Sequence, residues 1–308
     1  MTLALTGELG TGKTTFLQGF ASALGIDEQL TSPTYALEQQ YRGARGDFLH
    51  LDLYRLDQTQ SEELLRSSEN FSGIRCIEWS ERISLERLKS TGHVIHVALE
   101  EQDQHSRRIH CTFLDAALIP GQQIDQWRKD VLLPAHIVRH CDTVADVCNT
   151  LAEDLIRRGI LVRKRALHDA ARIHDLLRFI DFRRGGHPEN THTDEQRSLW
   201  ASLAQRFPGM HHEAACAHFL REHGFPVIAT IVEVHGLELP SPDRSTIEQK
   251  LLFYADKRVL IDKVVTLEER FADFAKRYGG GKTSEEGKMW YEEAKRVERE
   301  LFSEGTRI

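Results

Sequence analysis

Residues 7–14, which read GELGTGKT, constrain this chain of 308 residues more than any other segment. Two glycines five positions apart are followed by Lys13 and Thr14, and an apolar run at residues 3–5 precedes them. This is the spacing of a P-loop, in which glycines let backbone N–H groups turn toward phosphate oxygens. A helix that begins behind the loop adds a dipole that favours anions. The segment therefore predicts a strand, a phosphate loop and a helix, with Lys13 on the outer phosphates and the Thr14 hydroxyl on Mg²⁺.

Two further apolar runs carry a carboxylate at or near their ends. Residues 48–53 alternate apolar and polar side chains and include Asp52, and residues 74–78 end in Glu78. Ligands of open α/β sheets lie beyond the carboxyl ends of the strands. Asp52 and Glu78 are therefore candidates for holding Mg²⁺ or its waters, or for orienting an attacking water.

A threonine and a hairpin complete the pattern of the first half. Thr34 follows a Ser-Pro turn, where a hydroxyl can contact a γ-phosphate or its metal, although a plain loop is an equally good interpretation of these residues. Residues 93–99 and 109–114 alternate apolar and polar side chains around a polar turn, which predicts a β-hairpin.

Charge and composition narrow the class of protein. The formal net charge is −7, and residues 1–120 contain 11 Lys and Arg against 17 Asp and Glu. This acidic first half argues against a broad electrostatic contact with nucleic acid. The sequence has no apolar run of membrane-spanning length, and its five cysteines are scattered, which predicts reduced thiols in a cytoplasmic protein.

Four motifs occur in order over residues 1–118: GELGTGKTT, TSPTYALEQQY, HLDLYRL and IEWSERI. With them, this part of the chain resembles the TsaE (YjeE) family of P-loop ATPases. That family supplies the ATPase subunit for threonylcarbamoyl modification of the adenosine next to the anticodon in tRNA. The resemblance implies ATP and Mg²⁺ as cofactors and TsaB and TsaD as partners, whereas the chain's own charge argues against direct contact with tRNA.

The resemblance also assigns roles to single residues. It implies catalytic roles for Lys13, Asp52 and Glu78, a switch-like role for Thr34, and Mg²⁺ ligation by Thr14 and Glu78. The implied nucleotide-binding residues are Glu8, Gly10, Thr11, Gly12, Lys13, Thr14, Thr15, Thr34 and Trp79. Family members usually carry a strand and a helix before the P-loop strand, whereas Gly7 is preceded here by six residues. We therefore expect either an upstream start codon or a sheet that lacks an edge element.

In the second half of the chain, the apolar residues follow helical spacing over long segments, and histidine is frequent. Apolar residues recur at helical spacing from residue 137 to residue 155, and His140 lies on that stripe. Two His-Asp pairs, at residues 168–169 and 174–175, fall on a predicted helix over residues 165–180. The apolar neighbours of the second pair predict that it faces inward and that the first pair faces solvent.

Six residues of the second half follow one another in the order His…His-Asp…His…His…Asp, and apart from the adjacent His-Asp pair they lie on separate predicted segments. They are His140, His174, Asp175, His212, His235 and Asp256. Taken singly, each has a plain interpretation as a core histidine, a helix cap or an ion-pair partner. Together they resemble the HD-domain pattern of metal-dependent phosphohydrolases over residues 132–275. Either His211 or His212 fits its place in the order, and the spacing to the apolar stripe favours His212.

The HD resemblance implies one metal on His140, His174, Asp175 and Asp256. It implies a second metal, bridged by Asp175, on His212 and His235. Such a mixed His and carboxylate site accepts iron, manganese or zinc. Asp175 would be catalytic, the substrate a nucleotide or related phosphate ester, and Arg178 or Lys257 would steady its phosphate.

We therefore expect two domains. Residues 1–118 would form an α/β P-loop ATPase domain, residues 119–131 a linker, and residues 132–308 an all-α HD domain that ends in a charged helix. The expected protein is bifunctional, an ATPase for tRNA modification joined to a metal-dependent phosphohydrolase. The alternative is an ATP-switched assembly module for TsaB and TsaD that carries an inactive helical scaffold.

Overall fold

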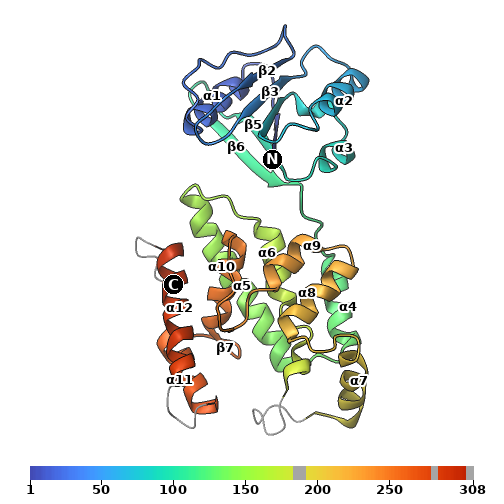
Figure 1. The fold of residues 1–308 in the computed structure, drawn as a ribbon, viewed down its shortest axis with the longest axis vertical. Coiled ribbons are helices and arrows are strands. Elements are labelled where there is room, and N and C mark those ends of the chain that lie inside the picture. Colours follow the sequence, from blue (N-terminus) through green and yellow to red (C-terminus); the bar gives the residue numbers. More distant parts are fainter. Residues whose placement is uncertain (183–191, 279–283, 303–308) are drawn as a thin grey trace. The chain divides into compact units, whose positions relative to one another are not determined.

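The computed structural model describes residues 1–182, 192–278 and 284–302, and the chain divides into two compact units, Met1–Asp115 and Ala116–Ile308. The first unit is a six-stranded sheet with helices on both of its faces (Figure 1). Its strands are β1 (Thr2–Thr6), β2 (Glu38–Tyr41), β3 (Phe48–Asp52), β4 (Ile74–Glu78), β5 (Val94–Glu101) and β6 (Arg107–Phe113). Its helices are α1 (Lys13–Ala23), α2 (Gln58–Ser67), the 3₁₀ turn η1 (Ser80–Arg82) and α3 (Leu85–Lys89).

The strand order, β2-β3-β4-β1-β5-β6, brings the predicted site segments to one edge of the sheet. The four central strands are parallel, and β2 and β6 are antiparallel edge strands. Glu78 is in register with both Asp52 on β3 and Leu5 on β1. The carboxyl ends of three adjacent strands therefore meet where the P-loop begins, which confirms the predicted α/β class and the β5–β6 hairpin. The expected missing edge element stays a prediction.

Alternation along the strands gives the sheet two apolar faces. Leu17 and Ala21 of α1 pack over one face with Leu3 and Leu5. Helices α2 and α3 cover the opposite face, where Leu65 joins the second core (Figure 1). Packing on both faces thus holds the parallel strands in position, and with them the loops at the ends of the strands.

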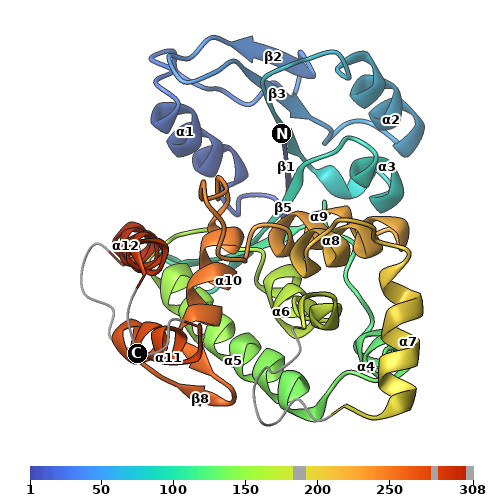
Figure 2. The same cartoon turned by 60° about the horizontal axis from the view of Figure 1, so that its bottom comes forward.

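The second unit is helical. Its helices are α4 (Gly121–Asp130), α5 (Ala135–Arg157), α6 (Lys164–Ile173), η2 (Arg178–Asp181), α7 (Asp194–Ala204), α8 (His212–Glu222), α9 (Pro226–Val232), α10 (Ile247–Lys257), α11 (Leu267–Tyr278) and α12 (Glu285–Leu301). Two short strands, β7 (Val259–Leu260) and β8 (Lys263–Val264), form a hairpin after α10. Helices α5, α6 and α10 pack together in the centre, and α12 lies beside α10 and α11 (Figure 2). Within the described residues, none of the helices is long and apolar enough to cross a bilayer.

The predicted linker at residues 119–131 is instead part of the helical unit. It contains helix α4, whose Ile124 and Trp127 are buried in the same core as α5 and α6. Arg128 is also buried, and its guanidinium donates to Asp142 of α5 at 2.8 Å. The Pro-Gly pair that suggested a linker stands at the start of this helix, where proline is well tolerated.

The predicted helix over residues 165–180 breaks after Ile173. His174 Nδ1 donates to the carbonyl of Ala171 at 2.7 Å. In a continuous α-helix that carbonyl would accept the backbone N–H of Asp175. The chain continues through a tight turn into η2. His174 and Asp175 therefore stand in the turn between α6 and η2, where their side chains are 0% and 14% exposed.

A buried ion pair joins α12 to the rest of the helical unit. Arg244 donates to the carbonyls of Val234 and Gly236, and its Nη1 lies 2.7 Å from Glu293 Oε1 on α12. The side chains are 3% and 10% exposed, so water cannot replace the lost partner if either is removed.

We predict that Glu293→Ala lowers the free energy of unfolding of the helical unit by about 3 kcal/mol, because it leaves the Arg244 guanidinium buried without its carboxylate. Urea unfolding of the full chain measures this change, and hydrogen exchange of α10 and α12 assigns it to the helical unit. The control is Glu292→Ala, an exposed neighbour on the same helix, which should change stability by less than about 0.5 kcal/mol. Equal effects of the two substitutions would contradict the prediction.

Candidate functional site

The P-loop connects β1 to α1 and needs its glycines for two different reasons. A side chain at Gly7 would place its Cβ 2.6 Å from the carbonyl oxygen of Leu99, closer than real contacts allow. Gly10 and Gly12 have φ of 83° and 96°, the left-handed region that costs other residues energy. Lys13 curls over the loop, and its Nζ donates to the carbonyls of Gly7 at 2.7 Å and Glu8 at 2.9 Å.

Glu78 at the end of β4 is tied to the first turn of α1. Thr14 Oγ1 donates to Glu78 Oε1 at 2.8 Å. His50 Nε2 lies 2.9 Å from the same oxygen, and its imidazole is fully buried. The structure therefore brings together Thr14 and Glu78, the two side chains predicted to ligate Mg²⁺.

Asp52 at the end of β3 accepts hydrogen bonds from the segment that contains the predicted switch residue. Thr34 Oγ1 donates to Asp52 Oδ2 at 2.6 Å, and Ser32 Oγ donates to the same oxygen at 2.7 Å. The backbone N–H of Tyr54 donates to the other oxygen at 3.0 Å. The loop that carries Thr34 thus reaches the carboxyl end of β3 rather than lying away from the site.

Trp79 lies over the P-loop lysine. Its backbone adopts a left-handed conformation with φ of 61°, and Lys13 Nζ lies 3.8 Å from the centre of its ring. Burial lowers the pKa of Lys13, and the charges of Glu78, Glu81 and Asp52 work against that shift. The remaining predicted nucleotide-binding residues also belong to the loop or the first turn of α1: Glu8, Gly10, Thr11, Gly12 and Thr15.

These residues fit a nucleotide and its magnesium ion. The loop offers backbone N–H groups at a helix N-terminus and a lysine ammonium, which suit phosphate. A threonine hydroxyl beside a buried carboxylate suits Mg²⁺, which prefers oxygen ligands. The donor set and its position beyond three parallel strands therefore suit a nucleoside triphosphate.

The helical unit brings together the six metal ligands predicted for it, with four imidazoles around the carboxylates of Asp175 and Asp256. His140 Nε2 lies 2.9 Å from Asp256 Oδ1, and His174 Nε2 lies 3.7 Å from the same oxygen. On the other side, Asp175 Oδ1 lies 3.0 Å from His212 Nε2 and 3.6 Å from His235 Nε2. His174 Nε2 is 4.0 Å from Asp175 Oδ2, which links the two halves.

All four imidazoles present the same nitrogen to the carboxylates. Three of them donate Nδ1–H to a backbone carbonyl: His140 to Ile261, His174 to Ala171 and His235 to Val232. His212 Nδ1 lies 2.5 Å from Asp181 Oδ2 and 3.0 Å from Glu213 Oε2. An Nδ1–H fixed by an acceptor leaves Nε2 with its lone pair, the arrangement that metal-binding histidines adopt.

Two further observations suit a cation in this cluster. His174 Nε2 is buried and has no hydrogen-bond partner among the residues that the structure describes. Burial works against ionisation of Asp175 and Asp256, yet the charges of a protonated His174 and of Arg178 hold the pKa of Asp175 well below its usual range, and Lys257 does the same for Asp256. A bound cation would take the place of the proton on His174 Nε2. Two charged carboxylates and an unsatisfied buried imidazole nitrogen fit divalent metal ions.

Residues next to the cluster agree with the sequence-based expectations in one case and differ in another. His211 is exposed, and His212, which the spacing favoured, is the one that enters the cluster. His168 and Asp169 are half-buried rather than solvent-facing, because Asp169 accepts the backbone N–H of Ile119 at 3.0 Å. Lys257 pairs with the predicted ligand Asp256, and the role of Lys257 or Arg178 in steadying a phosphate stays a prediction.

Sequence reasoning missed several residues of the two sites. His50 could have been found, because in an alternating strand it shares a face with Asp52, two positions later. Asp181 and Glu213 carried little signal: Asp181 lies in the irregular η2 turn, and Glu213 directly follows His212, where a helical pattern does not show that both point inward.

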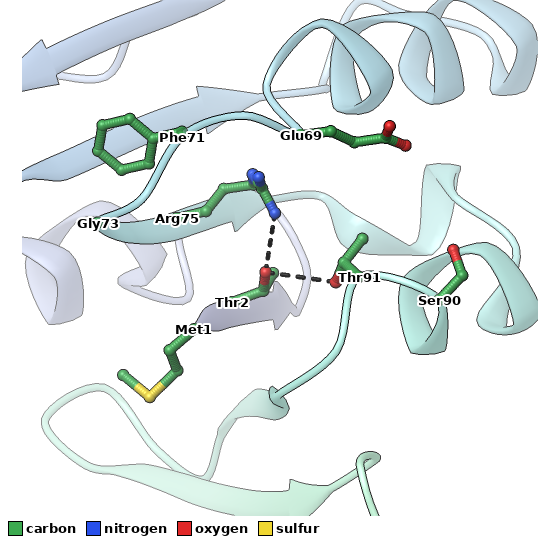
Figure 3. Close-up of a pocket in the computed structure, with 8 residues that line it drawn as sticks. All are labelled: Met1, Thr2, Glu69, Phe71, Gly73, Arg75, Ser90 and Thr91. Atoms are coloured by element: carbon green, nitrogen blue, oxygen red, sulfur yellow. Dashed lines mark hydrogen bonds between the residues drawn. The ribbon is translucent and has the colours of Figure 1, made fainter.

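A cavity of about 280 Å³ lies near the amino ends of β1 and β4, whereas the P-loop follows the carboxyl end of β1 (Figure 3). The buried Arg75 guanidinium donates to Thr2 Oγ1 at 3.1 Å and to the carbonyl of Ser68 at the end of α2. Thr2 also contacts Thr91 at 3.4 Å. Three of the lining side chains, Arg75, Thr2 and Thr91, are thus hydrogen-bonded to one another, and none of the predicted site residues lines the cavity.

The first unit is similar in sequence to proteins of a known family. A model of the family described as "Threonylcarbamoyl adenosine biosynthesis protein TsaE" matches residues 1–109. A protein of Nostoc sp. named tRNA threonylcarbamoyladenosine biosynthesis protein TsaE is 39% identical over 115 residues, which are 36% of this chain and 68% of the relative. Proteins of the same name from Synechocystis sp. and Bacillus subtilis are 40% and 35% identical over 86 and 91 residues.

The last two matches cover 26% and 28% of this chain and 55% and 58% of those relatives. The chain therefore spans between about half and two thirds of the length of these curated relatives. The helical unit lies outside the residues that the family model matches.

We predict that Gly7→Ala weakens binding of a fluorescent ATP analogue by at least about tenfold, because the added Cβ would displace the loop from Leu99. Equilibrium fluorescence titration measures the change. Gly19→Ala on α1 is the matched control, because a Cβ added at Gly19 would meet no other atom within 4 Å. It should leave binding unchanged, and a loss of binding in both variants would count against the role of the loop.

Proposed function

The chain belongs to the TsaE family through its N-terminal unit, and from this membership we propose that the unit binds and hydrolyses ATP in the biosynthesis of threonylcarbamoyladenosine in tRNA. The observation that carries the proposal is the meeting of the P-loop with Asp52 and Glu78 at the ends of three adjacent strands. TsaB and TsaD are the partners that the family resemblance implies. The names of the relatives supply the pathway, and the geometry of the site supports the ATP chemistry.

The residues of the site have separable tasks in this proposal. Lys13 supplies positive charge to the outer phosphates, and the loop N–H groups hold them. Thr14 and Glu78 would hold Mg²⁺, which neutralises charge on the phosphate oxygens. Asp52 would orient an attacking water, and its hydrogen bonds with Thr34 and Ser32 would couple that carboxylate to the switch-like loop.

We predict that Lys13→Ala lowers ATP turnover by about 100-fold or more, because it removes a charge that acts on the transferring phosphoryl group. Phosphate release by the full chain, with and without TsaB and TsaD, measures the change. Lys89→Ala, at an exposed position on α3, is the control and should retain turnover.

The same experiment separates the two versions of the proposal. Turnover that needs TsaB and TsaD, together with ATP binding in their absence, supports an ATP-switched assembly module. Turnover by the chain alone supports an independent ATPase. An absence of both ATP binding and turnover in the wild type would overturn the proposal.

For the helical unit we propose a metal-dependent phosphohydrolase of the HD type. Support comes from the four imidazoles whose Nδ1 atoms are fixed by acceptors and whose Nε2 atoms face Asp175 and Asp256. Divalent metals held there would lower the pKa of a bound water and hold phosphate oxygens. Arg178 lies beside His212, with Nη1 2.9 Å from Nε2, and its guanidinium would hold an anionic substrate next to the ligand set.

We predict that the purified full chain holds about one or two transition-metal ions and that Asp175→Asn loses most of them, because Asp175 belongs to both halves of the cluster. Elemental mass spectrometry measures the stoichiometry. Asp169→Asn changes the other His-Asp pair, which lies on α6, and should keep the metal. If the wild type stays metal-free after incubation with manganese or iron, the helical unit is a scaffold rather than a hydrolase.

A further inference from the structure

His50 occupies a place that the ATPase proposal does not use. It lies on β3, two residues before Asp52, and its side chain is completely buried. Its ring packs edge-on against Phe48, with the ring centres 6.2 Å apart. A polar ring in the apolar layer beneath α1 is costly unless it makes a hydrogen bond that matters to the structure or to the site.

The single hydrogen bond of the His50 ring points at a predicted magnesium ligand. Nε2 lies 2.9 Å from Glu78 Oε1, whereas Nδ1 is buried and has no hydrogen-bond partner in the part of the chain that the structure describes. A proton on Nδ1 would therefore be a buried, unsatisfied N–H group, which costs about 1–3 kcal/mol. The proton consequently belongs on Nε2, and His50 is the donor to Glu78.

Thr14 donates to the same oxygen of Glu78 at 2.8 Å. Two donors from different elements, α1 and β3, thus fix the rotation of one buried carboxylate. Thr14 is itself a predicted Mg²⁺ ligand, so its hydroxyl is shared between Glu78 and the metal. His50 is the donor whose bond to Glu78 does not compete with the metal.

From this geometry we propose that His50 is a positioning residue of the ATP site, which holds the Glu78 carboxylate in the orientation that binds Mg²⁺. The proposal rests on the proposed ATPase function and adds a residue to it. It also gives a physical reason for the order of polar residues in the segment His50-Leu51-Asp52: the histidine sets the carboxylate of the neighbouring strand, and the aspartate reaches the site itself.

The test compares substitutions that keep and remove the donor at this place. His50→Gln retains an amide N–H at nearly the reach of Nε2, His50→Asn retains the amide but is too short, and His50→Leu removes the donor. Mn²⁺ serves as the probe: free Mn²⁺ is measured by electron paramagnetic resonance during titration of the full chain with bound ADP. Affinity for a fluorescent ADP analogue in EDTA reports on nucleotide binding without metal.

We expect the Kd of Mn²⁺ to rise by about 10-fold to 100-fold in His50→Leu and His50→Asn, and His50→Gln to restore most of the wild-type value. Nucleotide affinity in EDTA should be the same in all four proteins. An unchanged Kd of Mn²⁺ in His50→Asn and His50→Leu would overturn the proposal. So would a loss of nucleotide affinity in EDTA that equals the loss of Mn²⁺ affinity, because a merely structural role predicts that result.

Failure of the positioning role and failure of the ATPase proposal give different results. If wild-type protein binds ADP and Mn²⁺ and the His50 variants match it, only the role of His50 is wrong. If the wild type binds no nucleotide under conditions in which the chain is folded, the ATPase proposal itself fails and takes the role of His50 with it.

Discussion

The carboxylate of Glu78 is the point on which the first unit depends. It ends the central strand β4, and its oxygen accepts hydrogen bonds from Thr14 on α1 and His50 on β3. This one buried group therefore ties the P-loop helix to two strands of the sheet. Burying an isolated carboxylate costs free energy. The two hydrogen-bond donors and the nearby Lys13 ammonium offset this cost, so that a metal ligand can be held there.

A comparable constraint governs the helical unit, where the backbone sets the chemistry of the histidines. Carbonyl groups of Ala171, Val232 and Ile261 take the Nδ1–H of three imidazoles. Two of these carbonyls lie at the ends of α6 and α9, so the same hydrogen bonds that end the helices also orient the rings. Local structure and ligand geometry are thus produced by one set of contacts.

More of the first unit than of the second could be predicted from the sequence, for physical reasons. The P-loop and the strand ends were predictable because phosphate binding demands glycines at fixed spacing and because strands alternate with period two. The break after Ile173 was not, since it arises from a side-chain bond of His174 to Ala171 that competes with the helix. Helix α4 was missed because Pro120 and Gly121 indicate a linker as readily as a helix start.

The site roles follow the same division. Asp52, Glu78 and Thr34 were singled out as strand-end or turn residues, and the structure brings each to the carboxyl edge of the sheet. Asp181 and Glu213 surround His212 through tertiary contacts that no periodicity reveals. Residues that act on other residues, as His50 does on Glu78, leave a weaker trace in sequence than residues that touch a ligand.

The role proposed for the first unit is to serve threonylcarbamoyladenosine formation in tRNA. The most direct measurement is the amount of threonylcarbamoyladenosine in unmodified tRNA after incubation with TsaB, TsaD, ATP, Mg²⁺ and a supplied threonylcarbamoyl donor, with this chain as the only TsaE-type protein. We expect multiple-turnover formation of the modified nucleoside only when the chain is present. Formation of the same amount without the chain would show that the first unit does not have this role.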